Sequence, residues 1–64
     1  MENYLTAFYD EEATSCSARA KTWNVLADEA TSGDRKEVYR KRAQDWTDMA
    51  IAARQVAIAA SGLK

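Results

Sequence analysis

Two tryptophans at mirror-related positions constrain the fold of this chain more than any other feature. Trp23 and Trp46 flank a turn-like segment around Gly33, and a chain folded back at this glycine sets each indole against a small residue. Trp23 then faces Ala43, and Trp46 faces Ala20. Large side chains opposite small ones let two helices approach without voids, so the sequence predicts an antiparallel helical hairpin.

The same register continues along both helices at the 3.5-residue spacing of a coiled-coil seam. Each further pair in this register contains at least one small side chain: Tyr9 with Ala57, Ala13 with Ala53, Cys16 with Ala50, and Ala27 with Tyr39. The single cysteine cannot form an internal disulfide, and its place opposite an alanine favours a small buried apolar residue over a redox centre.

The composition favours an all-α protein. The 64 residues are 47% hydrophobic and 30% charged, with a formal net charge of −1, no proline and two glycines. No segment alternates in polarity as a strand does, and the alanine-rich runs favour helix. A signal peptide or a transmembrane segment is not indicated, and we expect a cytoplasmic protein that does not bind membranes.

We expect one helical-hairpin domain that spans residues 1–64. Its first helix covers about residues 3–32, its turn about 33–34 and its second helix about 35–61. Gly33 is expected to end the first helix in a left-handed conformation.

Capping residues support these boundaries. Asn3 is a good N-cap for the first helix. Asp34 and Glu37 have the spacing of a capping box at the start of the second helix, and Gly62 is expected to end it.

A hairpin of this length has a single internal interface, which is too small to offset the chain entropy lost on folding. One flank of each helix carries large apolar residues, and in an antiparallel pair these flanks fall on the same side. We therefore predict a homodimer in which a second copy covers this side to form a four-helix bundle. The predicted dimer interface consists of Tyr4, Phe8, Leu26, Val38, Met49, Val56 and Leu63.

Two isoleucines lie on the other flank of the second helix. Ile51 and Ile58 stand one heptad apart beside Arg40 and Arg54. They are either a second contact surface or tolerated surface residues, and the sequence leaves both interpretations open.

The sequence contains no recognisable catalytic machinery. It has no histidine, no glycine-rich phosphate loop and no nucleophile motif, and Cys16 lacks a basic partner that would activate it. Acidic residues at positions 10–12 and at Asp45 and Asp48 fall out of register across the hairpin, so a solvated helix face explains them better than a metal site. We predict that the protein is not an enzyme and needs no metal or cofactor.

A basic stretch opens the second helix and is dense enough to attract nucleic acid or a nucleotide. It consists of Arg35, Lys36, Arg40, Lys41 and Arg42. Neighbouring acidic residues offset it, and it has neither a repeated alternation of aromatic and basic residues nor the geometry of a recognition helix. We predict no direct nucleic-acid binding. The alternative function is that of a small oligomeric helical protein that binds an anionic ligand through this stretch.

Two blocks of sequence carry a resemblance to a known family. The first is Trp23-Asn24-Val25-Leu26 with Asp28-Glu29-Ala30-Thr31, and the second is Tyr39-Arg40, then Asp45-Trp46 and the Ala/Ile/Val-rich end. Over roughly residues 22–60 these blocks resemble a small phage-encoded anti-activator family, with a shorter turn here and a poor match over residues 1–20.

The resemblance implies a function in host takeover. Members of the family look like two-helix dimers that inhibit quorum sensing in Pseudomonas by binding a LuxR-type regulator at its DNA-binding domain, with a type IV pilus-assembly ATPase as a second target. A DNA-binding domain presents Lys and Arg, so a competitor should offer carboxylates and apolar anchors. The residues expected to bind the partner are Val25, Asp28, Glu29, Arg40, Asp45, Asp48, Ile51 and Ile58.

Overall fold

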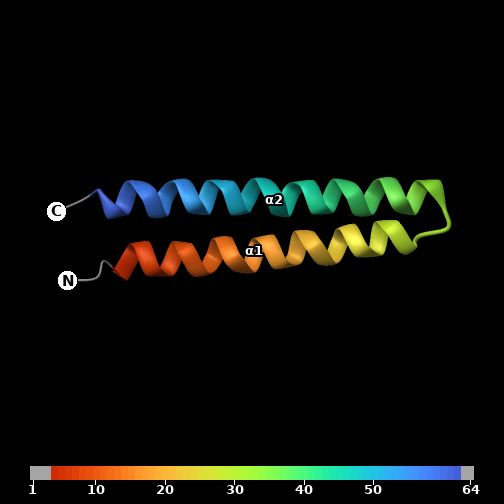
Figure 1. Ribbon diagram of the computed structural model, residues 1–64. Coiled ribbons are helices and arrows are strands. Elements are labelled where there is room, and N and C mark those ends of the chain that lie inside the picture. The colour runs from red at the N-terminus through yellow and green to blue at the C-terminus, as the bar shows by residue number, and fades with distance from the viewer. Residues whose placement is uncertain (1–3, 63–64) are drawn as a thin grey trace.

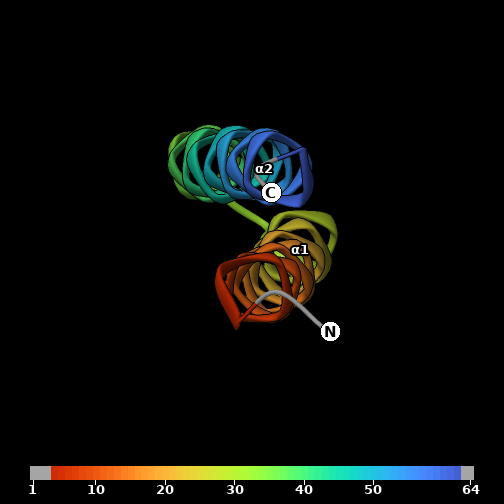
Figure 2. The ribbon, with the colours of Figure 1, turned by 90° about the vertical axis from the view of Figure 1, so that its left-hand side faces the viewer.

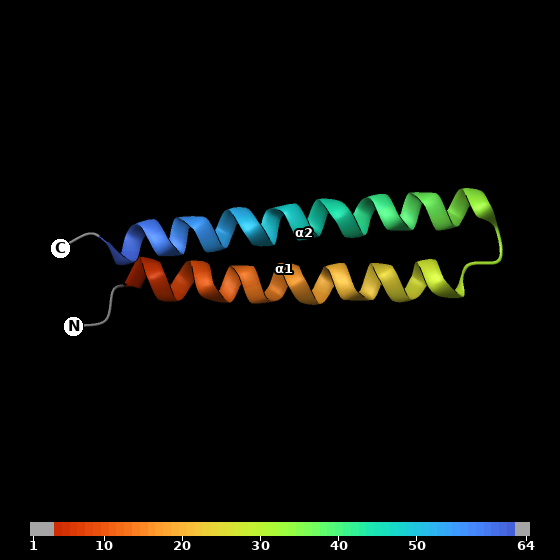
Figure 3. The same cartoon turned by 45° about the horizontal axis from the view of Figure 1, so that its top comes forward.

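The computed structural model describes residues 4–62, which form two long antiparallel helices joined by a short turn (Figure 1). Helix α1 spans Tyr4–Glu29 and helix α2 spans Gly33–Ser61. The start of α1 and the end of α2 lie together at the end of the hairpin opposite the turn (Figures 1 and 3). The molecule is a rod of 51 × 13 × 9 Å along its principal axes. The predicted all-helical hairpin is confirmed.

The seam between the helices is built from small side chains. The buried residues are Ala13, Cys16, Ala20, Ala27, Ala43, Ala50, Ala57 and Ala60. In each helix three of these alanines recur every seven residues, the repeat that keeps one side of a helix against its partner. The end-on view shows the helices inclined to each other, as interlocking side chains require (Figure 2). Within residues 4–62, no side chain larger than cysteine is buried.

Contacts around Trp23 support the predicted register. The ring centroids of Trp23 and Tyr39 lie 5.7 Å apart, and the Arg42 guanidinium lies 5.3 Å from the indole centroid. Trp23 therefore packs against the part of α2 that contains the buried Ala43. One detail differs from the prediction: Tyr39, which was predicted to face Ala27, packs against the Trp23 ring, so this level of the hairpin holds two large side chains.

Trp46 is held in the same way from the other helix. The Arg19 guanidinium lies 4.7 Å from the Trp46 ring centroid, and Ala20, the next residue along α1, is buried. Nearer the chain ends, the Thr6 hydroxyl donates a hydrogen bond across the hairpin to the Ala57 carbonyl at 3.5 Å. These cross-helix contacts lie within about one helical turn of the predicted register.

The turn lies earlier in the chain than the sequence predicts. Helix α1 ends at Glu29, three residues before its predicted end, and α2 begins at Gly33, two residues before its predicted start. The Ala30 N–H donates to the Ala27 carbonyl at 3.3 Å, which closes the last turn of α1 tightly. The prediction that Gly33 adopts a left-handed conformation is wrong, because no glycine among residues 4–62 has a positive φ.

The N-cap of α2 is Ser32, and the predicted cap at Asp34 is wrong. Ser32 has extended backbone angles, φ −91° and ψ 131°, and its hydroxyl accepts a hydrogen bond from the Arg35 N–H at 3.4 Å. Its carbonyl accepts the Lys36 N–H at 3.0 Å. The helix therefore starts before Asp34, whose negative charge then lies in the first turn, where the helix dipole favours it. The predicted N-cap Asn3 lies outside the described residues.

Replacing Ser32 with alanine should lower the free energy of unfolding by about 1 kcal/mol, because the Arg35 N–H would lose the hydroxyl that accepts its hydrogen bond. Urea unfolding followed by circular dichroism, at one fixed protein concentration, measures this change. Thr31→Ala is the matched control, since Thr31 is exposed and is not the cap residue. Equal stability of the two variants would contradict the assignment of the cap.

Candidate functional site

The first candidate surface is a shallow groove of about 290 Å³ on one side of the seam. We call it the Met49 groove, and it is lined by Phe8, Tyr9, Glu12, Cys16, Met49, Ala52, Ala53 and Val56. Phe8, Met49 and Val56 are 43%, 52% and 43% exposed. The fold thus brings three residues of the predicted dimer interface, from both helices, into one apolar groove.

The other predicted interface residues lie farther along the hairpin. The ring of Tyr4 stacks on that of Phe8 with centroids 6.4 Å apart, which extends the Met49 groove toward the start of α1. Leu26 and Val38 are exposed near the turn and line two separate hollows. Leu63 lies outside the described residues.

Two arginines interrupt this apolar side. Arg42 lies seven residues before Met49 and so on the same side of α2, and Arg19 lies seven residues before Leu26 on α1. Both guanidiniums cover tryptophan rings, and neither forms an ion pair within residues 4–62. They shield the indoles and divide the side into an apolar patch near the chain ends and a smaller one near the turn.

The sequence analysis did not predict that Arg19 and Arg42 cover the tryptophans, although a signal was present. Arg19 and Arg42 each directly precede the alanine that was predicted to face a tryptophan. A long cationic side chain at that place is within reach of the opposing ring face, where it gains a cation–π interaction.

The second candidate surface lies on the opposite side of the seam. We call it the Ile51 groove, and it is lined by Ser17, Thr47, Ala50, Ile51, Arg54, Gln55 and Ile58. Its volume is about 260 Å³. Met49 and Ile51 are two residues apart in α2, so they point to opposite sides of the hairpin. Ile51 is 52% exposed and Ile58 is 67% exposed, and Arg54 is the only charged residue in the lining.

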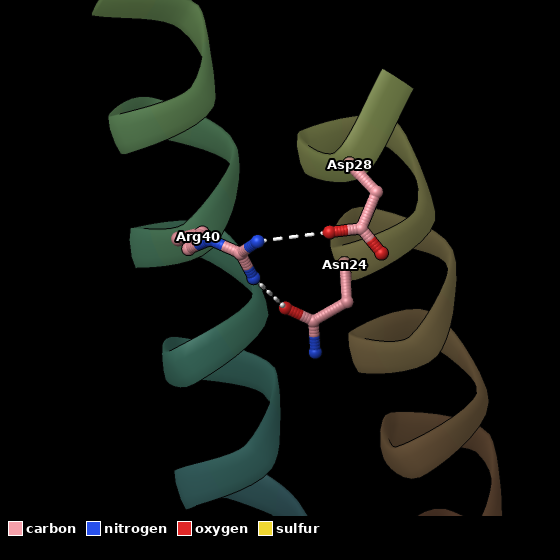
Figure 4. A network of polar contacts seen from close by, with 3 residues as sticks. All are labelled: Asn24, Asp28 and Arg40. Atoms are coloured by element: carbon pink, nitrogen blue, oxygen red, sulfur yellow. Dashed lines mark hydrogen bonds and ion pairs between the residues drawn. The ribbon is translucent and has the colours of Figure 1, made fainter. Parts of the chain in front are cut away.

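A polar cluster joins the two helices near the turn (Figure 4). Arg40 lies two heptads before Arg54 and therefore on the same side of α2 as the Ile51 groove. The Arg40 guanidinium forms an ion pair with Asp28 at 2.8 Å and donates a hydrogen bond to the Asn24 side-chain oxygen at 3.4 Å. Both charged side chains are more than half exposed, so the pair contributes little to stability. Arg40 and Asp28 nevertheless bind each other, although both were predicted to bind a partner.

The remaining predicted partner-binding residues are spread around the rod. Asp45 lines a hollow beside Arg42 on the side of the Met49 groove, and Glu29 lines a hollow near the turn. Asp48 accepts a hydrogen bond from the Gln44 side chain at 2.9 Å, and Val25 is exposed on α1. The eight residues therefore do not form one continuous surface.

The side chains of the basic stretch are likewise spread around the rod. Arg40 pairs with Asp28, Arg42 covers Trp23, and Arg35 lines a hollow near the turn. Successive residues of this stretch point in different directions around α2, so they do not converge on one anion site.

Residues 4–62 contain no group of three or more Cys, Asp or Glu side chains placed to hold a metal ion. Neither of the described helices is both long and apolar enough to cross a membrane.

Comparison of the chain with protein families, with curated proteins and with solved structures found no match.

Proposed function

We propose that this protein acts without catalysis, as a dimeric helical hairpin that binds the surface of another protein. The observation that carries the proposal is the distribution of apolar side chains. Alanines and one cysteine fill the seam, whereas Phe8, Met49, Ile51, Val56 and Ile58 are exposed in two grooves on opposite sides of the rod. Exposed apolar grooves of this kind are typical of contact surfaces.

In this proposal a second copy covers the Met49 groove, and two hairpins form a four-helix bundle. A seam of small residues buries little apolar surface, so the isolated hairpin needs further burial to offset its chain entropy. Phe8, Met49 and Val56 supply that surface at one place on both helices. A two-fold interface uses the same patch of both copies, which suits a groove centred on one residue cluster.

For the target, we propose the DNA-binding domain of a LuxR-type regulator in the cytoplasm of a phage-infected host, as the sequence resemblance implies. A type IV pilus-assembly ATPase is the second implied target. Such a DNA-binding domain is basic, and Asp45 and Asp48 are exposed one helical turn apart on α2. Carboxylates at these positions would raise the rate of encounter with a basic partner and make the association weaken with salt.

Gel-shift titration of a LuxR-type regulator on its operator tests this target. The wild-type protein should displace DNA, and changing Asp45 and Asp48 together to Asn should slow association severalfold with helix content and dimer unchanged. The matched control is Lys36→Gln with Lys41→Gln, which alters two exposed cations and leaves the Arg40–Asp28 ion pair intact. This control should bind like the wild type.

Two outcomes would redirect the proposal. If the lysine variant loses binding and the aspartate variant does not, the basic stretch is the contact surface and an anionic ligand becomes the better function. If none of the three proteins displaces DNA at micromolar excess, the proposed regulator is not the target.

A further inference from the structure

We propose that the Ile51 groove binds an amphipathic helix of a partner protein, one that carries a carboxylate between apolar residues. Asp45 and Asp48, which are proposed above to meet a basic domain, do not line this groove. The Ile51 groove instead presents a positive charge between two isoleucines and therefore selects an acidic partner.

The apolar part of the argument begins with the heptad position that Ile51 and Ile58 share. The same position holds Glu37 and Gln44 in the first half of α2, where it faces solvent. In the second half it switches to two isoleucines that are 52% and 67% exposed. A β-branched residue gains nothing on a solvated helix surface, where straight polar side chains are better helix formers. The switch marks a contact site in the half of α2 that contains the groove.

The charge of the groove comes from Arg54. It lies three residues after Ile51 and four before Ile58, so it stands between them on the helix surface. Within residues 4–62 its guanidinium forms no ion pair and no hydrogen bond. On α1, Asp10 lies one heptad before Ser17 on the same flank, but it lines a different hollow and is not paired with Arg54.

The shape of the groove favours a helix as occupant. It runs between two antiparallel helices, and its lining includes the small residues Thr47 and Ala50 of α2 and Ser17 of α1. Small residues there let a third helix approach closely, as in a helical bundle. Apolar residues one to two turns apart on that helix would contact Ile51 and Ile58. A carboxylate between them would form a charge-assisted hydrogen bond with Arg54.

The Ile51 groove lies on the opposite side of the rod from the Met49 groove. A dimer formed through the Met49 groove therefore leaves the Ile51 groove open in both copies. The proposed complex has one partner helix per hairpin and needs no rearrangement of the dimer.

A designed peptide tests the proposal. The probe is a helical alanine-based peptide of about 18 residues, with Leu at three positions on one face and one Glu between them. It is titrated into protein with labelled Ile and Met methyl groups. We expect the Ile51 and Ile58 signals to shift while Met49 stays unchanged. A matched peptide with Gln in place of Glu should bind about three- to tenfold more weakly.

A charge exchange completes the experiment. Arg54→Glu should bind the Glu peptide more weakly than the wild type does and should prefer a peptide with Lys at that position. Equal binding of the Glu, Gln and Lys peptides would overturn the proposal, as would shifts confined to Met49 or no binding at millimolar peptide. Assembly of dimers into tetramers that Arg54→Glu abolishes would also overturn it, because a second copy would then occupy the groove.

Discussion

Replacing Met49 with lysine should raise the dissociation constant of the proposed dimer about 100-fold or more, because two charges per dimer would then be buried in an apolar groove. Sedimentation velocity over a range of protein concentrations measures this change. In a chain whose stability depends on association, the helical signal should fall in the same concentration range.

Ile51→Lys is an unusually close control. Ile51 lies two residues from Met49 in the same helix and is equally exposed in the hairpin, at 52%. It lines the groove on the opposite side, so its replacement should leave the dimer intact. A dimer that survives Met49→Lys, or one that dissociates equally with either substitution, would show that the Met49 groove is not the interface between copies.

Replacing Ala43 with leucine should lower the free energy of unfolding by about 1–3 kcal/mol through overpacking. Ala43 is 2% exposed, and the same stretch of α2 already carries Tyr39 and Arg42 against the Trp23 ring. A leucine side chain can enter only by pushing the helices apart or moving the indole. Urea unfolding at a fixed protein concentration gives the difference.

The control for this substitution is Ala18→Leu. Ala18 is exposed on α1 and its side chain does not line the seam. The change should alter stability by less than about 0.5 kcal/mol, as surface substitutions usually do. A larger loss of stability in Ala18→Leu than in Ala43→Leu would contradict the claim that the small-residue seam tolerates substitution least.

The sequence predicts the seam well because the pairing of large and small residues is itself a linear pattern. Trp23 and Trp46 stand at heptad positions. Once the position of the turn is set, it determines which alanines face them. The turn is harder to predict. Ser32 and Asp34 are both good N-caps two residues apart, and only the backbone path decides which side chain reaches a free amide.

The surfaces are less predictable than the seam. Charge and apolar character selected the partner-binding residues, but the direction of each side chain around its helix decides which of them meet. Asp28 and Arg40 pair with each other, and Asp45 and Ile51 fall on different sides. Long side chains can also cross the seam, which is how Arg19 comes to cover Trp46.

We propose that the large apolar residues outside the seam make the hairpin depend on a second copy. Tryptophan fluorescence and circular dichroism on serial dilution, together with sedimentation equilibrium, test it most directly. We expect helical structure and dimer to be lost over the same concentration range. A monomer that keeps its full helical signal after dissociation would contradict the claim.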